Sequence, residues 1–584
     1  MAEVCHTRRM IIRQRQGNPL AQEALTQGGV HPVLARVFAA RGVRSRDELN
    51  DSLEALAHPS EMANLTQAAN WLGEMILANK KILVVADYDA DGATACAVAI
   101  RGLRRFGARV DYLVPDRFTF GYGLTPALID HAVKLNLKEP IDLIITVDNG
   151  ISSIAGVAHA KSLGLEVLVT DHHLPGEQLP DTLIVNPNLP NCEFPSKNLA
   201  GVGVMFYLLM ALRAWFRGQA KWAAEQLPRL DDLLPIVALG TVADVVKLDA
   251  NNRRLIAQGL RRLRKGNSFA GLNALFQVCN IEVRQANARH FGFMIGPRIN
   301  AAGRLSDMSI GIRCLLEDDP QTAVEIASEL DRLNRERREI EAEARETAAA
   351  QAIEIFESTS QASQDQWSLV LHHPDWHQGV IGLIAGRLKE RFYRPTIVLA
   401  QDSDGAWLKG SGRSIPGVHL RDVLERIDTQ HPGLMRAFGG HAMAAGLTLA
   451  RDRLALFTEL FEATVREFAS PEDLQQTLEV DGPLSNEFLR IDIAQMLSDQ
   501  VWGQGFPAPV FLNEFEVLGQ RRLKDQHIKL TLRLIDGDPK QAPIEAIWFN
   551  AERDLGPRAT LAYRLAINDW QGRSSVQLEV VGLA

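Results

Sequence analysis

Cysteine is scarce in this sequence, and no two cysteines stand in a metal-binding spacing. Five cysteines are spread over 584 residues, an odd number without a C-x-x-C pair. This pattern excludes a disulfide framework and a zinc site of the cysteine type. We therefore expect reduced thiols with no part in chemistry at Cys5, Cys96, Cys192, Cys279 and Cys314.

Long hydrophobic runs are also missing. The longest uncharged apolar stretch covers residues 199–212, which is too short to span a bilayer. The first residues, "MAEVCHTRRMIIRQRQ", carry charges where a signal peptide would be apolar. The sequence therefore predicts a soluble, cytoplasmic protein with no membrane contact.

Positive charge does not dominate the chain either. The net charge of -8 gives no overall attraction to nucleic acid. Residues 251–267 are an exception and read as a basic helix. Two interpretations of that helix stay open, a local wall for nucleic acid and a solvated helix face. Its basic residues are Arg253, Arg254, Arg261, Arg262, Arg264 and Lys265.

What the sequence does contain is a repeated order of apolar strand, turn and helix from about residue 80. The strand-like runs are "KILVVA", "RVDYLV", "DLIITV", "EVLVT" and "TLIVN". Most of them are apolar without alternation, which is typical of a parallel sheet covered on both faces. The sequence therefore predicts an α/β fold, and its length and ordinary composition predict a globular enzyme of about three to four domains.

The pattern changes twice further along the chain. Residues 320–358 have no internal Gly or Pro and predict one helix of roughly 55 Å that connects two lobes. A second α/β block follows, and near the C-terminus "HIKLTLRL" alternates strictly, which predicts a β-barrel or sandwich. The expected parts are an N-terminal extension, a catalytic α/β domain, the connecting helix, a second α/β domain and an OB-like barrel, over residues 1–45, 46–315, 316–360, 361–468 and 469–584.

The stretch "DYDADG" crowds three aspartates, Asp87, Asp89 and Asp91, directly after the first apolar run. A calcium loop of the EF-hand type begins in the same way. Its twelfth position requires a Glu and here is Val98, and a strand-like run rather than a helix precedes it, so that interpretation is excluded. A solvated turn remains as the structural alternative, because Asp and Gly are common in turns.

Three further apolar runs end in residues of the same kind. In a parallel sheet the carboxyl ends of the strands share one edge, so we expect these turns to converge with "DYDADG". Carboxylates with an imidazole suit Mn²⁺ or Mg²⁺, and the number of possible ligands favours two ions about 3.5 to 4 Å apart that activate water against a phosphorus centre. The runs "DLIITVDNG", "EVLVTDHH" and "LLPIVALGTVADVVKL" supply Asp148, Asn149, Asp171, His172, His173 and Asp244.

These motifs carry a family resemblance. "DYDADG", "VDNG", "DHH" and "GTVADVV", in this order, resemble the four motifs of the DHH phosphoesterase superfamily. "GPRINAAGRLSD", "WHQGVIGLIAGRL", "GSGRSIPGVHLRD" and "FGGHAMAAG" narrow the resemblance to the RecJ family of single-strand-specific DNA exonucleases, with its DHHA1 domain. The resemblance runs from about residue 80 to the C-terminus, and the first 45 or so residues match no motif.

The resemblance implies two divalent ions, Mn²⁺ or Mg²⁺, and catalytic roles for Asp89, Asp148, His172 and His173. Asp89 and Asp148 are the expected bridges between the ions, and His173 would face the scissile phosphate. Which aspartates of "DYDADG" bind directly and which bind through water stays open. The implied metal ligands are Asp87, Asp89, Asp91, Asp148, His172 and Asp244.

The second lobe carries candidate phosphate contacts. The turn "GSGRS" can present backbone N–H groups together with the Ser411 hydroxyl and the Arg413 guanidinium, although such turns are also common in surface loops. The resemblance implies that Arg117, Ser411 and Arg413 read the 5′ end. The full set of candidate DNA contacts is Arg117, Arg298, Asn300, Ser411, Arg413 and His441.

The C-terminal β block contains Trp548 and Phe549 beside basic residues, which suits an OB-fold that stacks single strands. The alternative is a β module whose aromatic residues fill its own core.

The expected function is 5′→3′ hydrolysis of single-stranded DNA by a two-metal exonuclease in recombination and repair. The resemblance adds a single-strand-binding protein and a helicase as partners. One alternative is another DHH phosphoesterase that acts on short oligonucleotides or cyclic dinucleotides, which the extra β block disfavours. The other is a single-strand-binding protein without catalysis, which the intact Asp89, Asp148 and His172 disfavour.

Overall fold

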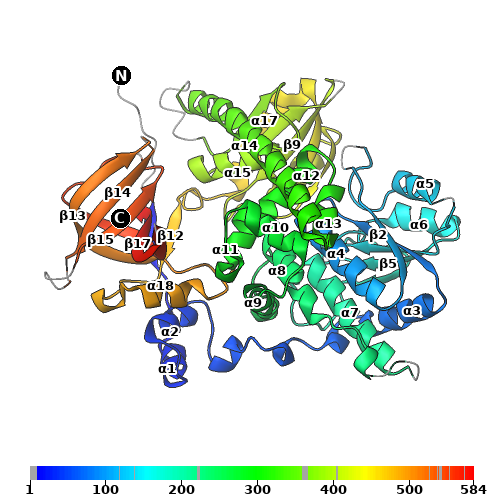
Figure 1. Ribbon diagram of the computed structural model, residues 1–584. Helices are drawn as coiled ribbons and strands as arrows, with labels where there is room; N and C mark the ends of the chain where they lie inside the picture. Colours follow the sequence, from blue (N-terminus) through cyan, green and yellow to red (C-terminus); the bar gives the residue numbers. More distant parts are fainter. Residues whose placement is uncertain are drawn as a thin grey trace.

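Figure 1 shows a computed structural model in which two α/β regions are joined by a long helix and a β-barrel lies to one side. The structure describes residues 10–584 apart from residues 117–118, 137, 220–221, 223, 358–365, 403–404, 525, 536, 538–541, 552 and 571. None of the described helices combines the length and the apolar character needed to cross a membrane.

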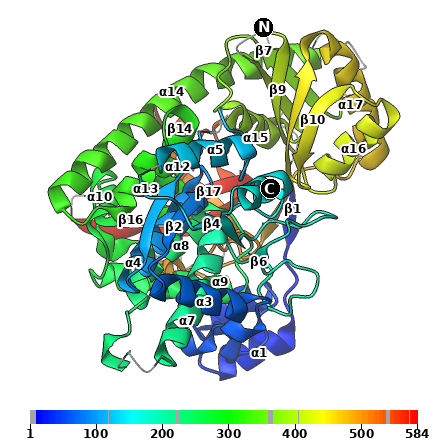
Figure 2. The ribbon, with the colours of Figure 1, turned by 90° about the vertical axis from the view of Figure 1, so that its right-hand side faces the viewer.

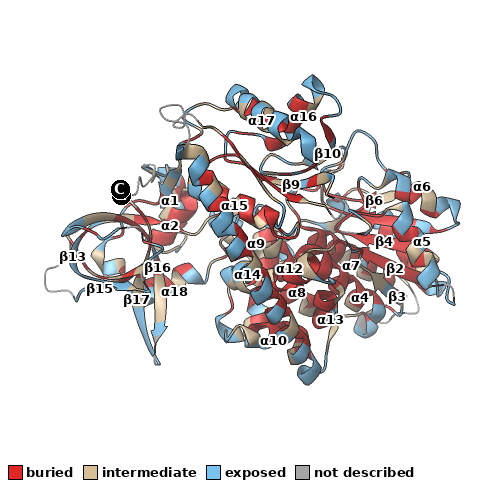
Figure 3. Cartoon of the chain, turned by 90° about the horizontal axis from the view of Figure 1, so that it is seen from above, coloured by how far each residue is buried: buried red, intermediate tan, exposed pale blue. Residues whose placement is uncertain are grey.

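The first α/β region is built on five parallel strands in the order β3-β2-β4-β5-β6. Alternate residues of β2 and β4 pack against α3, α4 and α7 on one face and against α5 and α6 on the other. This explains why both strands read as unbroken apolar runs and are buried throughout (Figure 3). The elements are α3 (Leu65–Leu77), β2 (Lys81–Ala86), α4 (Ala90–Arg105), β3 (Arg109–Leu113), α5 (Pro126–Leu135), β4 (Leu143–Val147), α6 (Ile154–Ser162), β5 (Glu166–Thr170), β6 (Leu183–Val185) and α7 (Gly201–Arg217).

The strand order reverses beside β2, since β3 lies on one side of it and β4 on the other. At such a switch point the loops that follow the two strands separate and leave room for a ligand. The five strands are those predicted, and the loops after β2 and β4 carry "DYDADG" and "VDNG" to this point.

A helical region follows the first sheet. Its helices are α8 (Leu234–Ala243), α9 (Ala250–Arg264), α10 (Ala270–Val278), α11 (Ala288–His290), the π-helical turn η7 (Phe291–Ile295), α12 (Gly296–Leu305), α13 (Ser309–Leu316) and α14 (Pro320–Glu357). The long helix predicted from composition is confirmed as α14, which has 38 residues. It begins beside α10 and ends beside β7 of the second sheet, so it spans the distance between the two α/β regions (Figures 1 and 2).

The apolar run before Asp244 is a helix, not a strand end. Residues 234–243 form α8 with Pro235 in its first turn, and Asp244 is the C-cap residue. A short apolar run does not distinguish a buried helix from a buried strand, because both lack a polar face. Asp244 therefore reaches the sheet edge from the end of a helix.

The basic helix is confirmed as α9, but its arginines contact the protein itself. Arg261 pairs with Asp51 at 2.6 Å, and Arg262 lies 3.3 Å from Asp231. Arg254 and Arg264 donate to backbone carbonyls at 3.0 and 2.7 Å. The cluster thus ties α9 to neighbouring segments, and the structure favours neither a free wall for nucleic acid nor a solvated face.

The second α/β region has a mixed sheet in the order β10-β11-β9-β8-β7, in which only β7 and β8 are parallel. Helices α16 and α17 cover one face, and α14 and α15 cover part of the other. The elements are β7 (Leu369–His373), α15 (Ile381–Phe392), β8 (Thr396–Gln401), β9 (Trp407–Arg413), α16 (Leu420–Gln430), β10 (Met435–Gly440), β11 (Ala444–Ala450) and α17 (Leu454–Phe468).

The C-terminal strands form a closed barrel in the order β13-β14-β15-β17-β16, which confirms the barrel prediction. In β14 buried residues alternate with half-buried ones, as its sequence predicts. Phe511, Phe515 and Tyr563 fill the core, whereas Phe549 is 48% exposed, so only some aromatic residues serve packing. The elements are β12 (Thr477–Val480), α18 (Ile491–Ser498), β13 (Phe511–Leu523), β14 (His527–Leu534), β15 (Ile544–Phe549), β16 (Arg558–Trp570) and β17 (Arg573–Leu583).

The N-terminal segment packs against this C-terminal part. Strand β1 (Ile11–Gln14) pairs in parallel with β12, and α1 (Pro19–Gln27) and α2 (Pro32–Ala39) lie beside α18 (Figure 1). Arg41 and Asp481 form a bidentate ion pair at 2.7 and 3.0 Å with both side chains 1% exposed. The described part of the N-terminal segment, which matched no motif, is thus packed against β12 and the elements that precede the barrel.

Candidate metal centre and phosphate clamp

Four segments that are distant in the sequence meet at the carboxyl edge of the first sheet. Nε2 of His172 lies 3.0 Å from Oδ1 of Asp148, 3.5 Å from Oδ2 of Asp244 and 4.0 Å from Oδ2 of Asp91. Asp87 and Asp89 offer oxygens within 4.8 Å of one from Asp148. We refer to Asp87, Asp89, Asp91, Asp148, His172 and Asp244 as the acidic cluster.

The "DYDADG" aspartates are fixed by backbone hydrogen bonds. Asp89 is the N-cap of α4, and its Oδ1 accepts from the N–H groups of Asp91 and Gly92 at 2.9 and 3.0 Å. Asp91 accepts from the N–H groups of Gly201 and Val202 at 2.6 and 3.0 Å, so it also holds the start of α7. The local turn therefore sets the direction of the Asp89 carboxylate, and the start of α7 sets that of Asp91, before any ligand is bound.

Asp148 depends on tight local geometry. Its backbone has φ of 63°, in the left-handed region, and a Cβ at Gly201 would lie only 2.6 Å from its carboxyl oxygen. The Asn149 amide donates to the carbonyls of Val85 and Val147 at 3.1 and 3.0 Å and so joins the ends of β2 and β4. Left-handed backbone at a non-glycine residue is uncommon and is often found at functional sites.

Asp171, which the predicted site set omitted, holds both histidines in place. Its Oδ1 accepts from the N–H groups of His172 and His173 and from Nδ1 of His173, the last at 2.7 Å. Burial alone would raise its pKa, but the hydrogen bond from His173 holds the pKa of Asp171 below its usual range. Its position directly before two histidines at a strand end was the signal in the sequence, because a carboxylate there can orient both rings.

The surroundings of His173 favour its protonated form. Burial lowers its pKa, but the Asp171 hydrogen bond and the nearby carboxylates outweigh burial and raise the pKa to about 9. Nδ1 is engaged by Asp171, so Nε2 is the nitrogen left for a substrate. Tyr122, also absent from the predicted set, packs edge-on against the His173 ring with centroids 6.1 Å apart.

Histidine is the only cationic side chain that the described residues place in an ion pair with the carboxylates of the acidic cluster. Among the described residues, no Lys or Arg pairs with Asp87, Asp91, Asp148 or Asp244. Burial, followed by the charge of Asp244, raises the pKa of Asp91 to about 8. Burial and Asp89 raise the pKa of Asp244 to about 7. Burial also raises the pKa values of Asp87 and Asp148 well above their usual range.

The donor set fits divalent cations. Asp87 Oδ1, Asp148 Oδ1, His172 Nε2 and Asp244 Oδ2 are buried and have no hydrogen-bond partner. Buried polar atoms are normally hydrogen-bonded, so four such atoms in one place need a ligand of positive charge. Oxygen and imidazole donors without thiolates suit Mn²⁺ or Mg²⁺. Three groups of possible ligands overlap here, namely Asp148, His172 and His173; Asp91, His172 and Asp244; and Asp87, Asp89 and Asp148.

Ser411 and Arg413 come together at the start of α15 in the second region. Arg413 donates to Ser411 Oγ at 3.3 Å and to the Gly412 carbonyl at 2.8 Å. A Cβ at Gly382, in the first turn of α15, would lie 2.9 Å from Ser411 Oγ and 3.1 Å from Nη2 of Arg413, so the glycine permits this close approach. We refer to Ser411, Arg413 and the first turn of α15 as the phosphate clamp.

The phosphate clamp has the charge expected for an anion site. Burial lowers the pKa of Arg413, and no carboxylate pairs with it within the part of the chain that the structure describes. A helix N-terminus presents free N–H groups and a partial positive charge, which favours phosphate. His441 lies in the turn between β10 and β11. Burial lowers the pKa of His441, and the charge of His173 contributes to the shift.

The other predicted DNA contacts behave differently. Arg298 is 6% exposed and pairs with Asp331 of α14 at 2.8 Å, and it also donates to the Met294 carbonyl. Asn300 accepts from the N–H of Ala90 at 2.8 Å and so anchors the start of α4. Both side chains are engaged in helix packing, and this geometry gives no support to a direct phosphate contact. Arg117 lies outside the described residues.

Comparison with family models gives three matches along the chain. The N-terminal domain of the DHH family matches residues 81–241, the DHHA1 domain matches residues 365–467, and the RecJ OB domain matches residues 480–582. These ranges lie inside three of the parts expected from the sequence, and the limits between the parts stay a prediction.

Curated relatives are similar over nearly the whole chain. The single-stranded-DNA-specific exonuclease RecJ of Escherichia coli (strain K12) is 46% identical over 559 residues, which are 94% of this chain and 95% of the relative. The protein of the same description from Bacillus subtilis (strain 168) is 34% identical over 97% of this chain and 70% of its own length.

Two solved structures are similar in fold. RecJ from Thermus thermophilus in complex with Mn²⁺ has a TM-score of 0.79 at 28% identity and covers 99% of this chain and 79% of its own. The structure of RecJ from the same organism in complex with Mg²⁺ has a TM-score of 0.74 at 28% identity, over 98% of this chain and 78% of its own.

Proposed function

This chain belongs to the RecJ family of single-stranded-DNA-specific exonucleases, and we propose that it hydrolyses single strands from the 5′ end with divalent cations held in the acidic cluster. The exonuclease activity follows from similarity over the full length of its relatives. The polarity, the number of ions and the role of each residue are implied by the family resemblance, and this chain's own geometry supports them.

One observation carries the proposal. Buried ligand atoms without hydrogen-bond partners, from Asp87, Asp148, His172 and Asp244, lie in overlapping groups, and the second lobe presents a half-buried arginine, Arg413, that pairs with no carboxylate among the described residues. Anionic ligands on one side and a cationic clamp on the other suit a substrate whose phosphates contact both a metal and an arginine. Asp148 and His172 each belong to two ligand groups, which supports two ions with shared ligands.

Different residues of the chain would hold the ions, donate a proton and position the reaction centre. Mn²⁺ or Mg²⁺ bound here would polarise a phosphate oxygen and lower the pKa of a bound water. Asp87, Asp89, Asp91, Asp148, His172 and Asp244 would hold the ions. Asp171 holds His173 by Nδ1, so that a protonated Nε2 can donate to an oxygen of the scissile phosphate. Asn149 keeps the ends of β2 and β4 at a fixed spacing under the reaction centre.

The phosphate clamp sets which end is cut. Ser411, Arg413 and the first turn of α15 would bind a terminal phosphate, with His441 between the clamp and the acidic cluster. A terminal phosphate bound there leaves the first internucleotide linkage for the metal side. A gap that fits one strand between the two lobes would exclude a duplex by its shape.

One assay tests the proposal against its alternatives. End-labelled single-stranded DNA, double-stranded DNA, a dinucleotide and pyrophosphate are each incubated with Mn²⁺, Mg²⁺ or EDTA, and the products are identified. We expect mononucleotides released from the 5′ end of single strands only, with no release in EDTA. Hydrolysis of the dinucleotide or pyrophosphate alone would favour another DHH phosphoesterase, and binding without hydrolysis would favour a non-catalytic protein.

We also propose that the protein serves recombination and repair in the cytoplasm. A single strand must first be exposed, which a helicase does, and a single-strand-binding protein would cover the strand before digestion. Pull-down of each partner class with the full chain, with and without single-stranded DNA, tests both associations.

A further inference from the structure

The π-helical turn η7 carries an exposed aromatic side chain. Phe293 is 71% exposed, compared with 49% for Tyr122 and 48% for Phe549. Its neighbours Phe291 and Ile295 are fully buried, so the turn is firmly anchored. Burial of a phenyl ring is favourable, and π-turns are frequent at functional sites, so an exposed ring on an anchored π-turn calls for an explanation.

Phe293 lies beside the helix end that carries Asp244. A Cβ at Gly292 would lie 3.4 Å from Cγ1 of Val242, and one at Gly296 would lie 3.1 Å from Cβ of Ala243. Asp244 follows directly as the C-cap of α8. The turn η7 therefore crosses the end of α8 next to the acidic cluster.

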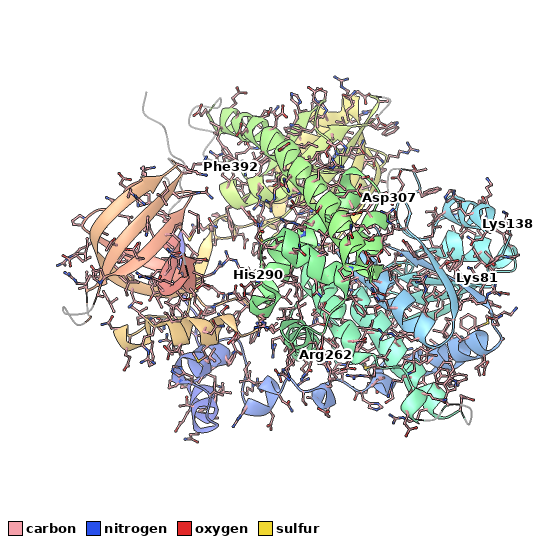
Figure 4. All side chains as sticks on the ribbon, viewed as in Figure 1. Lys81, Lys138, Arg262, His290, Asp307 and Phe392 are labelled. Atoms are coloured by element: carbon pink, nitrogen blue, oxygen red, sulfur yellow. The ribbon has the colours of Figure 1, made fainter. Side chains whose placement is uncertain are left out.

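The segment formed by α11 and η7 contacts the barrel through Arg289. Arg289 and Phe293 each stand two residues from buried Phe291, so both lie on the outer face of the turn. Arg289 reaches Glu579 of β17 at 3.1 Å. Figure 1 shows α11 at the side of the helical region that faces the barrel, and Figure 4 labels His290 there. Arg289 thus links this segment to the barrel, and Phe293 lies on the same outer face one helical turn further on.

Arg289 places positive charge on the same outer face as the Phe293 ring. Arg289 forms an ion pair with Glu579, and Arg564 of β16 stands opposite Glu579 in the strand register, so two arginines and one carboxylate lie in this part of the surface. A guanidinium has five N–H donors, and a pair with one carboxylate leaves donors for other anions. An exposed aromatic ring beside surplus guanidinium groups is the arrangement with which proteins hold single strands, by stacking bases and contacting phosphates.

We propose that Phe293 stacks a base of the single strand as it passes from the acidic cluster to the barrel, with Arg289 and Arg564 contacting the adjacent phosphates. The proposal rests on the proposed function, since it takes single-stranded DNA as the substrate. It makes Phe293 a positioning residue that acts on the strand downstream of the cleaved bond. Only a strand long enough to extend beyond the acidic cluster reaches the ring.

The test compares substrates of two lengths. Phe293→Ala should raise KM for a twenty-nucleotide single strand about tenfold and leave kcat unchanged, because one stacked base is lost. KM for a trinucleotide should not change. Phe293→Tyr should restore the long-strand KM, since its ring also stacks. Phe468→Ala, which truncates a 39% exposed phenyl ring on the far helix α17, is the matched control and should behave as wild type.

Two further readouts separate stacking from a structural effect. A 2-aminopurine placed in the long strand should be quenched on binding in EDTA by wild type and Phe293→Tyr, and not by Phe293→Ala. Arg564→Ala should lower the slope of log Kd against log salt by about 0.7, the value for one phosphate contact on a single strand.

Each remaining outcome has one meaning. An unchanged long-strand KM in Phe293→Ala, an equal rise for the trinucleotide, or no rescue by Phe293→Tyr overturns the stacking role. A wild-type chain that leaves single strands intact overturns the proposed function first. A wild type that degrades them and a Phe293→Ala variant that matches it overturn only the further inference.

Discussion

Buried charges meet opposite conditions in two regions of this molecule. At the junction of the N-terminal segment and the barrel, Asp481 and Arg41 are 1% exposed and neutralise each other. In the acidic cluster, the Asp148 side chain is 2% exposed, its Oδ1 has no hydrogen-bond partner, and the only ion-pair partner that the described residues offer it is His172. The same residue type is a structural tie in one place and an unsatisfied ligand in the other.

The difference shows how an unpaired buried charge points to a missing partner. A buried ion costs free energy unless an opposite charge and hydrogen bonds compensate it. Arg41 compensates Asp481 within the protein, whereas the acidic cluster must either hold protons or take up cations. Arg413 is the opposite case, a half-buried cation for which the fold supplies no carboxylate among the described residues, and it suits a phosphate.

Removal of one ligand from the acidic cluster should have the largest effect. We expect Asp148→Ala to lower kcat/KM on single-stranded DNA by more than about a hundredfold, because the metals that activate water lose a shared ligand. The variant should fold, and in EDTA its unfolding midpoint should not fall, since the remaining carboxylates repel less. Circular dichroism and a melting curve check the fold.

Asp181→Ala is the matched control for this variant. Asp181 has a 99% exposed side chain and pairs only at the surface with Lys161, so its loss should leave hydrolysis unchanged. Near-normal turnover by Asp148→Ala would falsify the assignment of Asp148 as a ligand.

Loss of the Arg41–Asp481 ion pair should lower the stability of the fold and leave the rate of hydrolysis unchanged. Arg41→Ala leaves Asp481 buried without its cation, and we expect unfolding to require about 3 to 5 kcal/mol less free energy. Urea unfolding measures the difference. Arg15→Ala tests the same junction at a more exposed pair with Glu479, 2.8 Å apart, and should cost no more than about 1 kcal/mol. Equal losses in the two variants would show that burial does not distinguish the pairs.

The metal-free acidic cluster should make stability depend on pH. The pKa values of Asp244 and Asp91, about 7 and about 8, lie above those of unfolded aspartate near 3.9. The folded state therefore binds protons more tightly than the unfolded chain. Its extra stability is full below about pH 4 and is lost as pH rises through 7 and 8.

Mn²⁺ should reverse this loss, because the ions replace the protons. At a concentration a hundredfold above Kd the gain is about 2.7 kcal/mol. Melting curves from pH 5 to 8 with EDTA or Mn²⁺ measure both effects. A midpoint that rises with pH in EDTA contradicts the raised pKa values.

Among the effects on hydrolysis, the smallest is expected at the phosphate clamp. Charge-assisted contacts to a terminal phosphate contribute about 1.5 to 3 kcal/mol, which is roughly a tenfold to hundredfold preference for a 5′-phosphate over a 5′-hydroxyl. Arg413→Ala should erase that preference, measured as the ratio of kcat/KM for the two substrates. Arg453→Ala, an exposed arginine in the same lobe, should keep it. If Arg413→Ala also keeps the preference, the terminal phosphate binds elsewhere.

Features set by neighbouring residues could be predicted from the sequence. The five strands of the first sheet, α14 and the alternation of β14 follow from apolar runs, helix propensity and a period of two, and the structure has them where the sequence predicts. The convergence of "DYDADG", "VDNG" and "DHH" followed from the rule that parallel strands end at one edge. The expectation that Asp244 follows a strand was wrong. The apolar run before it fits a buried helix as well as a buried strand, and it forms the helix α8.

Features set by distant residues could not be predicted. The sequence by itself determined which residues have ligand chemistry and which segments form strands and helices, because these depend on local composition and spacing. Tertiary structure alone decided which charges are paired. Arg298 meets Asp331, Arg41 meets Asp481 across 440 positions, and Arg413 meets no carboxylate among the described residues. The partner of a buried side chain comes from a distant chain segment that packing brings close. A local sequence pattern contains no information about which distant segment that is.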